Sequence, residues 1–168
     1  MKAKAPPGAV VLSFDEKGKT PVKHYGGKKW GGGKYRVPYK QKVKGLFDLF
    51  AVKNVHTGER HVRFYDWKNS FIVIDYFEWL MNTIYPESEV YVILDNWRCH
   101  TSAAFMAWAD LQPRLHTAYL PTTSSWMNDI ERDFSRVQNE VLDNSDFASP
   151  REAMGMISGF FENELSSS

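Results

Sequence analysis

Unbroken apolar runs with polar or turn-forming residues at their ends predict the strands of this chain. The runs at residues 9–15 and 89–95 are continuous rather than alternating, as in strands that are buried on both faces. His56-Thr57-Gly58-Glu59 is a short turn between two further runs, which predicts a hairpin. The predicted strands are residues 9–15, 45–54, 60–67, 89–95 and 114–120.

Apolar residues at helical spacing predict helices between and after these strands. Each predicted helix begins near a residue that favours a helix start: Ser70, Thr101 or Ser102, Ser125, and Pro150. The helix expected from Ser70 to about Tyr85 is apolar almost all round, so we expect it to be deeply packed or to meet a partner. The other helices are expected to run to about residue 111, over residues 126–142, and from residue 150 onward.

The order of these elements predicts a mixed α/β sheet with helices on both faces, in a single domain that spans residues 1–168. A chain of 168 residues with 43% hydrophobic content is long and apolar enough to bury a core. In such sheets, ligands bind beyond the carboxyl ends of the parallel strands. Asp15 and Asp95 each close a buried strand, so we expect both carboxylates at that edge.

Two carboxylates that are held close together repel each other, and a divalent cation is the usual compensation. A third acid is expected on the helix over 126–142, where Glu131 and Asp133 both flank the apolar stripe and periodicity does not choose between them. Glu131 follows Asp95 after 35 intervening residues. Carboxylates from two strands and a helix are typical of two-metal sites that cut or join phosphodiesters.

Charge is distributed unevenly along the chain. Ten of the 21 Lys and Arg residues, and none of the 20 Asp and Glu residues, lie in the Gly-rich stretch 17–44, which we expect to be a long loop or irregular hairpin. Lysine and arginine neutralise DNA phosphates while aromatic rings stack on bases, so this stretch predicts DNA contact. The alternative is a solvated, flexible insertion. The candidate DNA-binding residues in it are Lys28, Lys29, Lys34, Arg36 and Lys40.

The cysteine content and the lengths of the apolar runs indicate the compartment in which the chain works. The single cysteine, Cys99, excludes an internal disulfide, fits a reducing compartment and is expected to be a small buried residue. No run reaches 18 apolar residues, and the first residues lack the apolar core of a signal peptide. We therefore expect a cytoplasmic protein with no membrane contact.

Three strings along the chain resemble the ordered catalytic blocks of one transposase family. They are AVVLSFDEK at residues 9–17, VILDNWRCH at 92–100 and LPTTSSWMNDIER at 120–132. In that family the second block has an Asp-Asn pair followed closely by a His, and the third has a Trp, an Asn and then a Glu. The chain thereby resembles DDE-superfamily transposases, in particular bacterial and archaeal insertion-sequence relatives of the mariner elements.

This resemblance implies a ribonuclease H-like fold, with a mixed five-stranded sheet flanked by helices. It implies Asp15, Asp95 and Glu131 as the catalytic, metal-binding triad for Mg²⁺, with Mn²⁺ as a substitute, and it leaves Asp133 outside the site. The implied reaction is hydrolysis at the ends of a DNA element, followed by strand transfer by the 3′-hydroxyl. The implied partners are double-stranded DNA, at element ends and target, and a second copy of the chain, with the protein on the nucleoid when bound to DNA.

The histidine of the second block, His100, is a candidate for orienting a phosphate or a water in contact with DNA, and a structural role is the alternative. Full-length members of the family carry helix-turn-helix modules before the catalytic domain, and none is visible here. The sequence therefore indicates an isolated catalytic domain or a shortened copy. Two other functions fit the residues: a non-catalytic, transposase-derived DNA-binding or assembly module, or another ribonuclease H-like nuclease.

Overall fold

The computed structural model describes residues 7–26, 32–33, 36–121 and 128–165. Within these residues five strands form one mixed sheet in the order β3-β2-β1-β4-β5. Strand β1 pairs antiparallel with β2 and parallel with β4, which in turn pairs parallel with β5. The predicted five-stranded mixed sheet is therefore confirmed. The strands are β1 (Ala9–Val22), β2 (Gly45–Asn54), β3 (Arg60–Tyr65), β4 (Glu89–Leu94) and β5 (Leu115–Tyr119).

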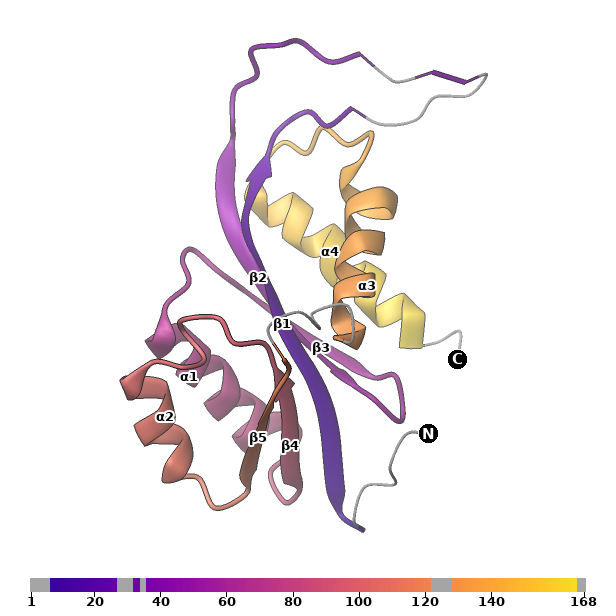
Figure 1. Cartoon of the computed structure of the whole chain (residues 1–168). Helices are drawn as coiled ribbons and strands as arrows, with labels where there is room; N and C mark the ends of the chain where they lie inside the picture. The colour runs from indigo at the N-terminus through magenta and orange to yellow at the C-terminus, as the bar shows by residue number, and fades with distance from the viewer. Residues whose placement is uncertain (1–6, 27–31, 34–35, 122–127, 166–168) are drawn as a thin grey trace.

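Helices cover both faces of this sheet, as the sequence predicts. Figure 1 shows α1 and α2 on one face and α3 and α4 on the other. Two of the helices continue into π-helical turns, η1 after α1 and η3 after α3. No helix in the described part of the chain is both long and apolar enough to cross a membrane. The helical elements are α1 (Ser70–Trp79), η1 (Leu80–Ile84), α2 (Ala103–Asp110), α3 (Asp129–Arg136), η3 (Val137–Leu142) and α4 (Pro150–Leu165).

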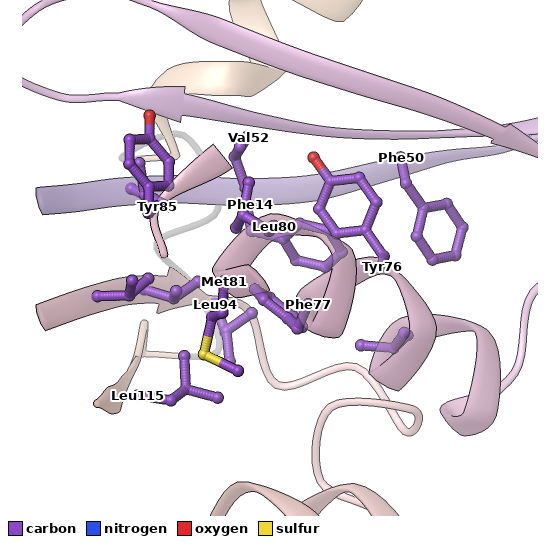
Figure 2. Packing of buried hydrophobic residues seen from close by; sticks show 14 of the residues in the cluster. Phe14, Phe50, Val52, Tyr76, Phe77, Leu80, Met81, Tyr85, Leu94 and Leu115 are labelled. Carbon is purple, nitrogen blue, oxygen red and sulfur yellow. The ribbon is translucent and has the colours of Figure 1, made fainter. Parts of the chain in front are cut away.

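Two hydrophobic clusters, one on each face, hold the helices to the sheet. On the α1 face the Phe14 ring packs 4.8 Å from the Phe77 ring and 5.3 Å from the Tyr76 ring, measured between centroids (Figure 2). On the other face Leu49 and Ala51 of β2 pack with residues of α3, η3 and α4. Because side chains alternate along a strand, Ser13, Asp15 and Lys17 of β1 face α3 rather than α1.

Strand β1 is longer than predicted, so the prediction that Asp15 ends a strand is wrong. Its parallel pairing with β4 stops at Ser13, opposite Ile93, but its antiparallel pairing with β2 continues to Val22, opposite Gly45. A β-bulge between Lys17 and Thr20 interrupts the pairing without ending it. Asp15 therefore lies just past the parallel part of the sheet, and the first residues of the basic stretch are strand rather than loop.

The helix starts also differ in part from the predicted ones. The N-cap of α1 is Asn69 instead of Ser70, because the Asn69 side chain accepts a hydrogen bond from the backbone N–H of Ile72 at 3.0 Å. Ser102 caps α2, as predicted. The expected cap Ser125 lies outside the described residues, and α3 begins after Asn128.

Candidate active site

Strands β1 and β4 set the positions of the two aspartates. Ser13 lies opposite Ile93 in the parallel register, and continuing that register by two residues brings Asp15 beside Asp95. Strand β4 ends at Leu94, so Asp95 follows directly from its carboxyl end. The two aspartates therefore meet at the edge where ligands bind in parallel sheets, as the sequence predicts.

Buried hydrogen bonds dock the start of α3 on β1 and bring Glu131 to the same edge. The Ser13 hydroxyl donates to Asn128 Oδ1, and Asn128 Nδ2 donates to the Phe14 carbonyl at 2.9 Å. The Ile130 N–H donates to Ser13 Oγ at 3.3 Å. Since Ser13 and Asp15 share one face of β1, this docking holds Glu131, one residue after Ile130, close to Asp15.

The carboxylate of Asp15 lies in a strongly negative environment. Burial, and then the charge of Glu16, raise the pKa of Asp15 to about 7, and the charges of Asp95 and Glu131 contribute in the same direction. One hydrogen bond opposes this shift, from the Glu16 backbone N–H to Asp15 Oδ1 at 2.8 Å. The three predicted acids are thus close enough for the protonation of one to depend on the other two.

His100 connects Asp95 with Glu16 beneath the site. Its side chain is fully buried, with Nδ1 2.8 Å from Asp95 Oδ1 and Nε2 3.2 Å from Glu16 Oε2, the latter without good hydrogen-bond alignment. Burial lowers the pKa of His100, but the contacts with Asp95 and Glu16 outweigh burial and raise it to about 9. The hydrogen bond from His100 in turn lowers the pKa of Asp95. A side chain buried in this way offers no surface to DNA, and its two ring nitrogens contact the Asp95 and Glu16 carboxylates.

Glu16 and Lys68 belong to the site although the sequence analysis did not select them. The Glu16 side chain is only 3% exposed, and Lys68 Nζ lies 3.4 Å from its Oε1. The same ammonium lies 3.9 Å from the centroid of the Trp97 ring, two residues after Asp95. The sequence does contain a signal for Glu16: it is an acid on the core-facing side of a buried strand. An acid in that position requires a cationic partner.

Replacing Glu16 with Gln should lower metal-dependent DNA cleavage about 10- to 100-fold, as is usual for a residue that orients a ligand group from behind. The expected loss is in kcat with little change in KM for DNA, because Glu16 acts through His100 and touches no substrate. Steady-state nicking rates, with Glu87→Gln on an exposed loop as the control, would measure it. An unchanged kcat would contradict the positioning role.

The donor set suits a hard divalent cation. Among the described residues, no hydrogen bond or ion pair engages Oδ2 of Asp15, Oδ2 of Asp95 or either carboxylate oxygen of Glu131. Such oxygens are the ligands that Mg²⁺ and Mn²⁺ prefer. However, no group of three His, Cys, Asp or Glu side chains in the described ranges is arranged to hold a metal ion. The metal-binding triad therefore stays a prediction.

Asp133, the alternative third acid, has a structural role. Arg60 donates to it through two nitrogens, Nε to Oδ2 at 2.9 Å and a terminal nitrogen to Oδ1 at 3.2 Å. Lys53 Nζ adds an ion pair at 3.2 Å, and the Asp133 side chain is only 4% exposed. Helical periodicity does not choose between Glu131 and Asp133, but α3 turns Asp133 toward cations of β2 and β3.

Only part of the basic stretch 17–44 is described. Arg36 and Lys40 are exposed, whereas Lys28, Lys29 and Lys34 lie outside the described residues. Lys44, at its end, is held by Asp146 at 2.7 Å. The structure thus leaves Arg36 and Lys40, two of the candidate DNA-binding side chains, free to reach a ligand in solvent.

Cys99, expected to be buried, is partly exposed instead.

Several solved structures share this fold. A Mos1 strand transfer complex superposes with a TM-score of 0.72 at 12% identity, and a Mos1 transposase paired-end complex with the left transposon end with 0.68 at 14%. Both alignments cover 90% of this chain and 47% of the Mos1 chain, so this chain spans about half the length of that transposase. The HTLV-2 integrase catalytic core domain with magnesium gives a TM-score of 0.52 at 14% identity, over 83% of this chain and 73% of that one. The fold is the ribonuclease H-like fold of transposase and integrase catalytic domains.

The family follows from the sequence itself. Residues 10–153 match the DDE superfamily endonuclease family, and the chain belongs to that family. The match spans both aspartates and Glu131. No curated protein sequence matches the chain.

Proposed function

We propose that this domain cuts and joins DNA phosphodiesters, with Asp15, Asp95 and Glu131 holding Mg²⁺ or, as a substitute, Mn²⁺. The observation that supports the proposal is that the β1–β4 register and the docking of α3 bring the three acids toward one edge of the sheet. Burial, and then the charges of Glu16, Asp95 and Glu131, raise the pKa of Asp15 there to about 7. Each of the three keeps an oxygen with no partner among the described residues. Membership of the DDE superfamily endonuclease family supports the same reaction.

Bound cations would stabilise charge on the attacking and leaving oxygens and ease deprotonation of the nucleophile. The residues of the chain would hold and orient the ligands for this chemistry. His100 fixes one oxygen of Asp95 and leaves the other available, and Glu16 fixes the His100 ring from behind. The Ser13–Asn128 contact holds the start of α3, and with it Glu131, against β1.

We further propose that the substrates are the two ends of a DNA element and its target, and that the working unit is a homodimer. Hydrolysis would free a 3′-hydroxyl at the element end, and the same site would then use it for strand transfer. The three sequence blocks and the Mos1 likeness support an origin in an insertion-sequence relative of the mariner elements. Such a protein would act in the cytoplasm, on the nucleoid.

Incubation of the domain with supercoiled plasmid at low salt tests the reaction class. We expect nicked circles in Mn²⁺ or Mg²⁺ and none in a chelator, because the unpartnered carboxylates need a cation to act on a phosphodiester. A labelled oligonucleotide with a free 3′-hydroxyl should become joined to the plasmid under the same conditions. Branched DNA and RNA–DNA hybrids serve as comparison substrates.

Two results would contradict the proposal. Salt-sensitive DNA binding without nicking in either metal would favour a non-catalytic binding or assembly module. Cleavage confined to branched or hybrid duplexes, with no joining of the 3′-hydroxyl, would favour another ribonuclease H-like nuclease.

A further inference from the structure

An open pocket lies beside the candidate active site, between β1 and the helical segment that carries Glu131. Its volume is about 300 Å³. The lining combines one lysine with hydroxyl and amide side chains: Lys17, Phe134, Ser135, Gln138 and Asn139. None of these residues belongs to the proposed metal site, so the pocket is a separate feature next to it.

Lys17 is held at this pocket by its place on β1. It lies two residues past Asp15, on the same face of the strand and at a distance of about 7 Å along it. The bulge that begins after Lys17 keeps the following lysine, Lys19, out of this alternation. Lys17 is therefore the cation of β1 that faces α3 next to Asp15.

The ammonium of Lys17 has no direct counter-charge among the described residues. Its side chain is partly buried, and Asp143 is the acid that acts on it. No hydrogen bond, and no ion pair within 4 Å, engages Lys17 in the described ranges. The nearby Asp143 carboxylate instead accepts a hydrogen bond from Gln138 Nε2 at 2.9 Å. A half-buried cation of this kind is stabilised by an anionic ligand.

The opposite wall of the pocket comes from the helical segment that carries Glu131. Residues 131, 135 and 138 share one side of a helix because they are four and three apart. Gln138 and Asn139 lie in the π-helical turn η3, a rare geometry that is frequent at functional sites. The Ser135 hydroxyl already donates to the Glu131 carbonyl at 3.3 Å, and Gln138 donates to Asp143. The Asn139 amide is therefore the neutral group that can donate to an anion without adding charge.

We propose that this pocket binds a backbone phosphate of the DNA strand, next to the phosphodiester that is cut. Lys17 supplies the charge, and the Asn139 amide supplies a hydrogen bond to a phosphate oxygen. A single phosphodiester carries the one negative charge that the one lysine matches. The inference rests on the proposed function, since DNA must lie across the acids, and it adds a contact that fixes the position of the strand.

The test is DNA binding without divalent cations, so that catalysis plays no part. Binding of a fluorescently labelled duplex of about 20 base pairs to the full chain is titrated at several salt concentrations, for the unmodified protein and for Lys17→Gln. Loss of one phosphate contact should make the slope of log affinity against log salt shallower by about one. The affinity at low salt should fall roughly five- to tenfold.

Three further variants separate the pocket from general charge effects. Lys17→Arg keeps the charge and should keep the slope. Asn139→Asp leaves Lys17 in place but adds a negative charge to the lining, and it should weaken binding to a similar extent. Arg151→Gln removes an exposed positive charge at the start of α4, outside the pocket, and should change the slope by less than Lys17→Gln. Thermal unfolding of each variant checks the fold.

Wild-type affinity and slope in both Lys17→Gln and Asn139→Asp would overturn the phosphate site, while leaving the proposed function intact. Failure of the unmodified chain to bind DNA at all would contradict both the phosphate site and the proposed function. Reduced binding in the two pocket variants would support the site even if the plasmid assay detected no cleavage.

Discussion

Replacing Asp95 with Asn is expected to reduce metal-dependent nicking of supercoiled plasmid by about 1,000-fold or more, beyond the 10- to 100-fold usual for residues behind a metal site. Asparagine has nearly the same shape as aspartate but lacks the negative charge that a hard cation requires. The rate is measured from the conversion of supercoiled to nicked circles in Mn²⁺.

The same substitution should leave the fold nearly intact. The amide oxygen of the introduced asparagine can still accept the hydrogen bond that His100 Nδ1 donates to Asp95 at 2.8 Å, so the free energy of unfolding should change by no more than about 1 kcal/mol. Asp110→Asn, at the exposed end of α2, is the matched control and should nick at the unmodified rate. Near-normal cleavage by the Asp95 variant would rule out Asp95 as a catalytic ligand.

Replacing Asp133 with Ala should lower the free energy of unfolding by about 3–5 kcal/mol, the usual cost of breaking a buried ion pair by removing one member. Two cations contact this carboxylate, Arg60 through two hydrogen bonds and Lys53 through an ion pair, and all three side chains are at most 14% exposed. Lys53 also lies 3.5 Å from Asp129 Oδ2, so most of the loss is expected from the Arg60 contact. Urea unfolding followed by circular dichroism would measure the loss.

Glu131→Gln, two residues earlier on the same helix, is the control for this prediction. Since no ion pair engages Glu131 among the described residues, its substitution should change stability by less than about 0.5 kcal/mol while abolishing cleavage. The reverse pattern, with a stable Asp133 variant that is inactive and a destabilised Glu131 variant, would exchange the roles of the two acids.

The sequence predicts the sheet well where apolar patterning alone determines it. The bounds of β2 agree with the prediction, because Gly45 and Asn54 mark its ends on either side of an apolar run. The extension of β1 to Val22 was not predictable in this way. Lys17, Gly18 and Lys19 have no strand pattern of their own. Pairing with β2 on both sides of the bulge continues the strand past them, although Lys19 itself has a positive φ of 43°.

The sequence likewise predicts only part of the candidate site. Asp15 and Asp95 could be selected because each follows an apolar run of a parallel strand. The choice between Glu131 and Asp133 could not come from helical periodicity, since both flank the apolar stripe and the cations that hold Asp133 come from other strands. The positions of His100 and Glu16 likewise depend on tertiary contact, because the ring of one must reach the carboxylate of the other across neighbouring strands.

Anomalous diffraction from crystals of the protein soaked in Mn²⁺ would test the proposed triad most directly. The triad predicts a manganese peak with oxygens of Asp15, Asp95 and Glu131 within about 2.0–2.6 Å of the metal ions. Manganese bound elsewhere at saturating concentration, with the three carboxylates uncoordinated, would contradict it.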